Sequence, residues 1–219
     1  DRSPPSACCF PEREDGVVED GLEVEIKLKV GDLVHRQDRI ASTKSRLEEM
    51  GASLVHPREF EDNLAFDFPD RPIVRTGSLL LVRILARGTR LIFKGPLAPL
   101  DGLIGARHET ELTIQFDETD ALLAIIRGLG MQPVFRYQKY RTTWNWKGVH
   151  VVIDETPIGL YLELEGERTL IEAGAKALGF GPDDFVTKSY RDLYLEHLDQ
   201  GAQGLQGSRS ADRMLFESP

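Results

Sequence analysis

Charged and apolar residues alternate in the first stretch of this chain that is typical of folded protein. In LEVEIKLKV, residues 22–30, charged side chains occupy every second position and apolar side chains occupy the positions between them. Side chains two residues apart in a β-strand lie on the same face, so this strand has one ionic face and one apolar face. A sheet with one face in water shows the same pattern, so this strand alone leaves open whether its ionic face meets solvent or a polar interior.

Seven further segments are predicted to be strands, and three of them repeat the alternation. Short turns such as 87–89 and 147–148 join neighbouring segments, which is typical of antiparallel hairpins. With the first strand, these segments give about eight strands, enough to close a barrel. The seven segments are 58–68, 78–85, 89–95, 107–116, 135–146, 149–155 and 160–166.

Four helices are predicted between the strands. One follows Asp32 and ends at Gly51, two cover 117–130 and 167–180, and the last runs from about 183 to 199. If the sheet closes, these helices can cover its apolar outer face while the ionic faces of the strands point inward. Neither end of the chain shows apolar periodicity, so we expect a disordered leader at 1–20, one domain at 21–199 and a disordered tail at 200–219.

The net charge of -9 disfavours nonspecific binding to nucleic acids or anionic membranes. No apolar run approaches the ~20 residues of a membrane span, and the N-terminal residues lack the features of a signal peptide, so the sequence predicts a cytoplasmic protein. Cys8 and Cys9 are adjacent and the five histidines show no ligand spacing, so neither a zinc site nor a disulfide framework is expected. A monomer or a homodimer is expected.

Two segments favour a polar interior over a solvated face. SLLLVRIL and TRLIFKG are almost continuous apolar runs, and we take Arg83 of the first and Lys94 of the second as candidate cations of the interior. A closed barrel would gather these cations with the charged faces of the other strands. Carboxylates suit a hard divalent cation, and lysine and arginine suit phosphate oxygens, so a metal and phosphate site is one hypothesis for such an interior. None of the common phosphate-loop, dinucleotide, serine-hydrolase or zinc-protease motifs occurs.

The E-x-E-x-K of LEVEIK is followed by FEDNLAFDFPD, Arg83, IFKGP, RHETE, KYR, VIDETPIGLYLELEG and TKSYRDL, over about residues 22–198. The order of these motifs resembles the CYTH superfamily, the triphosphate tunnel metalloenzymes. The resemblance implies an α+β, mainly antiparallel protein: an eight-stranded β-barrel open as a tunnel, with a charged interior and helices outside. It also implies a small-molecule triphosphate substrate and Mg or Mn as cofactor.

The same resemblance implies roles for individual residues. The implied metal ligands are Glu23, Glu25, Asp154, Glu163 and Glu165. The implied phosphate ligands are Lys27, Arg83, Lys94, Arg107, Lys139, Arg141 and Lys188, the last of which would reach the tunnel from the final helix or lie exposed on it. Glu109 and Glu111 form a supporting acidic pair. The implied catalytic set is Glu23, Glu25, Lys27 and Glu165.

One position departs from the family pattern. Many relatives have Arg-x-Arg where this chain has Leu81-Val82-Arg83, so one expected phosphate ligand is replaced by leucine. The change affects phosphate binding and leaves the implied metal site complete.

Metal-dependent cleavage of a phosphoanhydride bond in inorganic, nucleoside or thiamine triphosphate is the predicted reaction. The alternatives are a class IV adenylyl cyclase that makes cyclic AMP and pyrophosphate from ATP, and a noncatalytic module that binds polyphosphate or a nucleotide. The opening EVEIKL resembles the branch labelled as cyclases, although that label is a poor guide to the reaction. Trp144 and Trp146 are candidates for stacking a base, but their spacing on a strand is more typical of packing residues.

Overall fold

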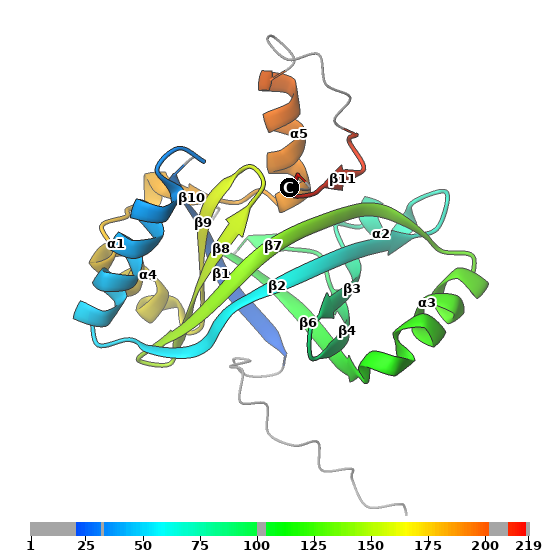
Figure 1. The fold of residues 1–219 in the computed structure, drawn as a ribbon, viewed down its shortest axis with the longest axis horizontal. Helices are drawn as coiled ribbons and strands as arrows, with labels where there is room; N and C mark the ends of the chain where they lie inside the picture. The colour runs from blue at the N-terminus through cyan, green and yellow to red at the C-terminus, as the bar shows by residue number, and fades with distance from the viewer. Residues whose placement is uncertain (1–20, 32, 100–103, 202–209, 218–219) are drawn as a thin grey trace, which may run out of the picture.

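A closed antiparallel barrel forms the body of the molecule, with helices packed outside it (Figure 1). The computed structural model describes residues 21–31, 33–99, 104–201 and 210–217, and the expected leader at 1–20, with both cysteines, lies outside these ranges. The eight barrel strands are β1 (Leu22–Gly31), β2 (Ser53–Asp67), β3 (Leu79–Leu85), β4 (Gly88–Lys94), β6 (Gly105–Ile114), β7 (Gln132–Trp146), β8 (Val149–Thr156) and β9 (Gly159–Glu165).

The barrel closes through the pairing of its first strand with β6. The strand order is β1-β9-β8-β7-β2-β3-β4-β6, and β6 returns to β1 with Leu22 opposite His108 and Glu25 opposite Gly105. Each of these neighbouring strand pairs is antiparallel. The predicted eight-stranded antiparallel barrel is therefore confirmed.

Three two-residue strands extend the sheet, and two of them correct the predictions. β5 (Ala98–Pro99) pairs with β6, β10 (Phe185–Val186) with β1, and β11 (Arg213–Met214) with β7. β10 lies where a helix was expected, because its backbone pairs with β1 and Phe185 packs on the apolar cluster there. The expected disordered tail is corrected at β11, because Arg213 and Met214 pair with β7 and the side chain of Met214 is fully buried.

In the part of the chain that the structure describes, five α-helices lie outside the barrel wall or over its mouth: α1 (Arg36–Glu49), α2 (Pro72–Arg75), α3 (Thr119–Gly128), α4 (Arg168–Ala177) and α5 (Tyr190–Gly201). Figure 1 shows α1 and α4 against one side of the barrel, α3 at the opposite end, and α5 standing above the strands. α1 starts after the left-handed residue His35, later than predicted, and Leu33 and Val34 before it are exposed. The last helix starts at Tyr190 rather than near 183.

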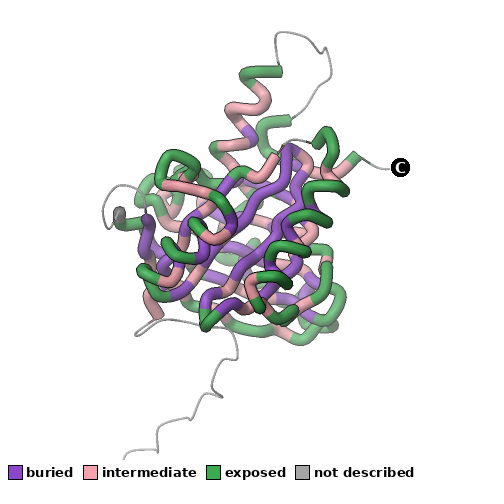
Figure 2. The backbone as a smooth tube through the Cα atoms, turned by 90° about the vertical axis from the view of Figure 1, so that its left-hand side faces the viewer, coloured by how far each residue is buried: buried purple, intermediate pink, exposed green. Residues whose placement is uncertain are grey.

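The main apolar core lies between the outer face of the barrel and helices α1 and α4. Ile26, Leu28 and Leu164 of the alternating strands pack there with Leu47 of α1 and Ile171 of α4. Figure 2 shows buried residues concentrated along the strands, while the surrounding segments are more exposed. The apolar faces of the alternating strands therefore point outward into this core, and their ionic faces point into the barrel.

The two candidate base-stacking residues belong to the same core. Trp144 and Trp146 are both buried in the cluster under α1 and α4, and the indole nitrogen of Trp146 donates to the carbonyl oxygen of Met50 at 3.1 Å. They are packing residues. Among the described residues, no helix combines the length and apolar character needed to cross a membrane.

Candidate functional site

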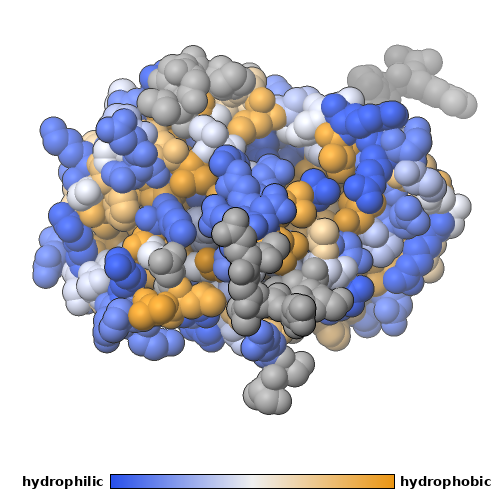
Figure 3. All heavy atoms as spheres, turned by 90° about the horizontal axis from the view of Figure 1, so that it is seen from above, coloured by the Kyte–Doolittle hydropathy of each residue, from blue (hydrophilic) through white to orange (hydrophobic). Residues whose placement is uncertain are grey.

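The barrel encloses a cavity of about 1020 Å³, and the predicted ionic residues point into it. All of the predicted site residues line this cavity except Asp154: Glu23, Glu25, Lys27, Arg83, Lys94, Arg107, Glu109, Glu111, Lys139, Arg141, Glu163, Glu165 and Lys188. Figure 3 shows the molecule from the side on which α5 stands, where hydrophilic residues gather over the centre of the barrel. The prediction of a polar interior is therefore confirmed. The ionic faces of these strands line the cavity and do not form the outer surface of the barrel.

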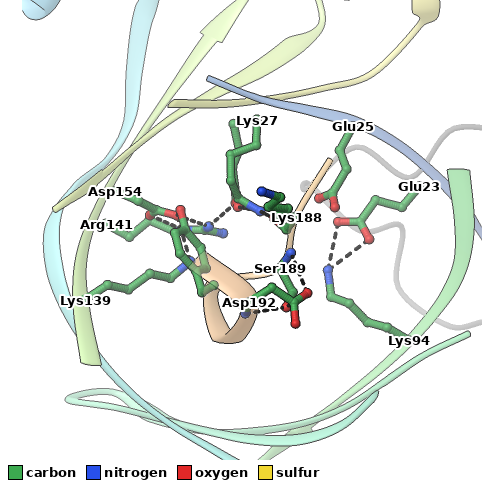
Figure 4. A network of polar contacts seen from close by, with 12 residues as sticks. Glu23, Glu25, Lys27, Lys94, Lys139, Arg141, Asp154, Lys188, Ser189 and Asp192 are labelled. Carbon is green, nitrogen blue, oxygen red and sulfur yellow. Dashed lines mark hydrogen bonds and ion pairs between the residues drawn. The ribbon is translucent and has the colours of Figure 1, made fainter. Parts of the chain in front are cut away.

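Four carboxylates and two cations meet around β1, and we call them the acidic cluster: Glu23, Glu25, Lys94, Arg107, Glu109 and Glu165. Lys94 Nζ lies 2.9 Å from both carboxylate oxygens of Glu23 (Figure 4). Arg107 donates from Nε to Glu23 at 3.2 Å and from Nη2 to Glu25 at 2.8 Å. Lys94 also forms an ion pair with Glu109. Carboxylates thus outnumber the cations that neutralise them.

Glu165 shows the effect of this excess of carboxylates. It lies opposite Glu25 of β1 and opposite His150 of β8 in the strand register. Burial and the carboxylates of Glu23 and Glu25 raise the pKa of Glu165 to about 8, against the attraction of Lys94. A divalent cation would stabilise the ionised form of such a carboxyl group, because it would replace the missing positive charge.

Four cations and three carboxylates form a second group, the basic cluster: Lys27, Arg83, Lys139, Arg141, Glu61, Asp154 and Glu163. Arg141 donates to Asp154 at 2.8 and 2.6 Å and also forms an ion pair with Glu163. Lys27 lies 3.4 Å from Glu163. Burial would raise the pKa of Glu163, but the neighbouring cations, Arg141 foremost, hold it well below its usual range. Cations exceed carboxylates in this cluster.

Asp154 lies beneath the cations of the basic cluster. Its side chain is fully buried and accepts hydrogen bonds from Lys139 Nζ at 2.8 Å, from Arg141, and from the Tyr190 hydroxyl at 2.7 Å (Figure 4). Asp154 does not line the cavity. Its carboxylate therefore holds the two cations in place from behind.

The sequence prediction missed Glu61 on β2. It is buried, and its carboxylate lies 3.3 Å from Arg83 and 3.6 Å from Lys139. Burial would raise the pKa of Glu61, but Arg83, Lys139 and Arg141 lower it to about 2. The FEDN motif contained this residue, but Asp62 beside it carries the same charge on the opposite face, where it pairs with Arg136. Because two consecutive residues are acidic, the sequence of this strand does not show the alternation of charged and apolar residues that marks the other site residues.

Two other predicted residues lie in less expected surroundings. Lys188 precedes α5 instead of projecting from it; its Nζ pairs with Glu196 at 2.5 Å, and about half of its side chain is exposed. The carbonyl oxygen of Lys188 accepts a hydrogen bond from Lys27 at 3.3 Å. Glu111 pairs with Arg90 at 3.0 Å, a cavity-lining cation that the sequence prediction also missed.

Leu81 occupies the inward-facing side of β3 between Leu79 and Arg83. It is almost fully buried in an apolar cluster with Phe135 and with Tyr190 of α5. This part of the barrel interior is therefore apolar where the family pattern has a second arginine. The leucine provides a surface on which α5 packs.

Within the ranges that the structure describes, no group of three or more His, Cys, Asp and Glu side chains is arranged as a preformed metal site. Glu23 and Glu25 instead bond to Lys94 and Arg107. The oxygen donors are nevertheless of the type that hard divalent cations prefer, and the raised pKa of Glu165 marks an excess of carboxylates among them. The chemistry of the donor set thus fits such a cation.

The protein is an antiparallel β-barrel whose interior contains an acidic cluster and a basic cluster. This places it in the class of barrels with a charged tunnel. The CYTH domain profile matches residues 21–197, more than three quarters of the sequence, and the chain belongs to the CYTH family. The resemblance seen in the sequence is confirmed. No curated protein matches the chain in sequence.

Solved structures with this fold come from several organisms. A proposed adenylate cyclase from Vibrio parahaemolyticus has a TM-score of 0.67 at 17% identity and aligns over 80% of this chain and 98% of its own. The PH1819 protein from Pyrococcus horikoshii OT3 has a TM-score of 0.62 at 24% identity, over 80% and 99%. HpAC1 from Hippeastrum, described as a proposed adenylyl cyclase with a dominant triphosphatase activity, has a TM-score of 0.59 at 14% identity, over 80% and 96%. These likenesses show the fold.

Proposed function

We propose that this protein cleaves a phosphoanhydride bond of a triphosphate with the help of a divalent metal ion. The observation that carries the proposal is the meeting of an acidic cluster and a basic cluster in one cavity inside the barrel. A metal–triphosphate complex has the complementary charges, with a cation on one part and several phosphate oxygens on the other. The cavity therefore matches such a complex in charge.

The basic cluster would hold the phosphate oxygens. Arg83, Lys139 and Arg141 are held by buried carboxylates, so their ammonium and guanidinium groups are fixed before a ligand arrives. Fixed donors lower the cost of orienting a phosphate chain and stabilise charge that develops on its oxygens during cleavage. Lys27 completes this group on β1, and Lys188 lies at its border beside α5.

The acidic cluster would hold the metal ion, with Glu23, Glu25 and Glu165 as ligands. A metal bound there would polarise phosphate oxygens and lower the pKa of a coordinated water. Lys94 and Arg107, which now neutralise Glu23 and Glu25, would then be available to phosphate oxygens. We do not extend the metal role to Asp154 and Glu163, because both belong to the basic cluster, in which cations outnumber carboxylates.

The described activity of one structural relative supports hydrolysis. HpAC1 has a dominant triphosphatase activity although it is named as a cyclase, so a cyclase-like fold is compatible with a triphosphatase. Cyclisation of ATP is the second candidate, favoured by the names of other relatives and by a cavity of about 1020 Å³, which exceeds the size of many small-ligand pockets. Binding without turnover is the third.

Phosphorus NMR of the purified protein with ATP, and separately with tripolyphosphate, in Mg²⁺ or Mn²⁺, separates the three candidates. Release of orthophosphate supports the triphosphatase, whereas cyclic AMP with pyrophosphate identifies a cyclase. Bound phosphates that are not turned over would indicate a binding module. Glu25→Gln and Glu165→Gln should each remove most of the activity, whereas Glu172→Gln on the exposed face of α4 should leave it unchanged. Normal turnover in both cavity variants would contradict the proposal.

Three expectations from the sequence remain predictions: Mg²⁺ or Mn²⁺ as the metal ion, a cytoplasmic location, and a monomeric or homodimeric state. The metal can be tested by titrating each ion into the metal-free protein. Sedimentation at several protein concentrations tests the oligomeric state.

A further inference from the structure

We propose that Tyr190 is a positioning residue for the phosphate-binding cations: its hydroxyl fixes Asp154, and Asp154 fixes Lys139 and Arg141. The inference rests on the proposed function, because it concerns how the basic cluster receives a triphosphate. Tyr190 is the first residue of α5, and it lines the cavity.

The hydroxyl of Tyr190 shares one carboxylate oxygen with two cations. Asp154 Oδ2 accepts from the Tyr190 hydroxyl at 2.7 Å, from Lys139 Nζ at 2.8 Å and from Arg141 Nη2 at 2.6 Å, while Oδ1 accepts from Arg141 Nε at 2.8 Å. Burial, and then the Asp154 carboxylate, raise the pKa of Tyr190 well above its usual value. The hydroxyl therefore remains protonated and donates to Asp154 at neutral pH.

The ring of Tyr190 also contacts two cations from different strands. Lys27 Nζ of β1 lies 4.5 Å from the ring centroid, and Lys139 Nζ of β7 lies 5.2 Å from it. An ammonium group over an aromatic face is attracted without being neutralised. The ring can therefore hold both lysines near the cavity while their charge remains available to phosphate.

The hydroxyl is the third donor that orients the Asp154 carboxylate. It occupies part of the acceptor capacity of Oδ2, beside Lys139 and Arg141. Without the hydroxyl, the buried carboxylate would be oriented by the two cations alone, so the positions of these cations would be less well fixed. A phosphate chain would then have to order them when it binds, so its affinity should fall.

A neighbouring tyrosine provides a matched control. Tyr194 lies one turn further along α5 in the same apolar cluster, and its hydroxyl donates to the carbonyl oxygen of Ser210 at 3.3 Å, away from the cations. Tyr190→Phe and Tyr194→Phe each remove one hydroxyl and keep the ring. Both should lower Tm, Tyr194→Phe by about 2–4 °C and Tyr190→Phe by more, because only the Tyr190 hydroxyl bonds to a buried carboxylate. Only a positioning role predicts different ligand affinities for the two variants.

The test measures the Kd for tripolyphosphate of the metal-free protein by calorimetry, and KM and kcat with metal. Tyr190→Phe should raise Kd and KM by about 3- to 10-fold with kcat within about twofold, whereas Tyr194→Phe should change neither Kd nor KM by more than about twofold. Tyr190→Leu, which also removes the ring, should weaken binding further, so that phenylalanine acts as a partial rescue.

The outcomes separate this inference from the proposed function. Equal Kd values for the wild type and Tyr190→Phe, or equal losses in both phenylalanine variants, would overturn the positioning role. If the wild type binds tripolyphosphate without cleaving it and Tyr190→Phe alone weakens that binding, the positioning role stands and the proposed hydrolysis fails. If the wild type binds neither tripolyphosphate nor ATP, with or without the metal ion, both fail.

Discussion

Replacement of Glu165 by glutamine should stabilise the metal-free protein at and above neutral pH. Burial and the carboxylates of Glu23 and Glu25 raise the pKa of Glu165 from its ordinary value of 4.5 to about 8 in the folded state. The folded protein therefore binds this proton more tightly than the unfolded chain does. The protonated Glu165 therefore contributes to the free energy of unfolding. This contribution is fully present below pH 4.5 and is lost as the pH rises from 4.5 to about 8.

The difference between the pKa of Glu165 in the folded and in the unfolded state sets how much unfolding free energy is lost as the pH rises. One pH unit corresponds to about 1.4 kcal/mol, so the interval from 4.5 to about 8 gives an upper limit of roughly 5 kcal/mol. Side-chain relaxation and entry of water reduce this limit, and we expect about 2–3 kcal/mol at pH 8. Glutamine has nearly the same shape and no charge, so Glu165→Gln should avoid most of the loss.

Urea unfolding in EDTA, measured from pH 5 to pH 9, tests this reasoning. The unfolding free energies of the wild type and Glu165→Gln should nearly coincide at pH 5 and separate progressively up to pH 8, with the variant more stable. Glu172→Gln, which changes an exposed carboxylate of α4, should follow the wild type across the range. This role of Glu165 would be refuted if the difference in unfolding free energy between the wild type and Glu165→Gln did not change with pH. It would also be refuted if the wild type were the more stable of the two at pH 8.

Three further substitutions test other parts of the site. Asp154→Asn should destabilise the protein by about 3 kcal/mol or more in urea unfolding, because Lys139 and Arg141 lose the buried carboxylate that both of them share; a loss below about 1 kcal/mol would contradict this role. Lys188→Ala should change stability by less than about 0.5 kcal/mol, because its ion pair with Glu196 is exposed, yet it should raise KM for tripolyphosphate; an unchanged KM would exclude a phosphate role. Met214→Ala should cost about 2–4 kcal/mol, because this side chain of β11 is fully buried; a nearly silent change would contradict this packing.

The regular alternation of β1 and β9 made much of the site predictable from the sequence. Glu23, Glu25 and Glu163 each have apolar neighbours on both sides, and Glu165 follows Leu164 in the same alternation, so a closed barrel places all four carboxylates inside. Because the spacing within a strand fixes the face of each residue, the sequence predicts which side chains point inward. It does not fix the register between strands, so the pairing of Glu25 with Glu165 required the structure.

The missed features lacked a periodic pattern or depended on distant parts of the chain. β10 and β11 contain two residues each, too few to show a period, and their positions depend on edges that β1 and β7 leave unpaired. Asp154 shares the inward side of β8 with His150, but α5 and the cations cover it, and no local pattern predicts that cover. Tertiary packing decides these details.

The internal ion pairs connect the two proposed ligands. Lys94 and Arg107 neutralise Glu23 and Glu25, so a metal ion that binds these carboxylates must displace the two cations. Triphosphate oxygens would stabilise the displaced cations, and the metal would stabilise the carboxylates that they leave. The metal ion therefore lowers the free-energy cost of binding triphosphate, and triphosphate lowers the cost of binding the metal ion by the same amount. This coupling follows from the charges of the acidic cluster and needs no movement of the barrel strands. The same ion pairs explain how a barrel can enclose this many charges before either ligand is bound.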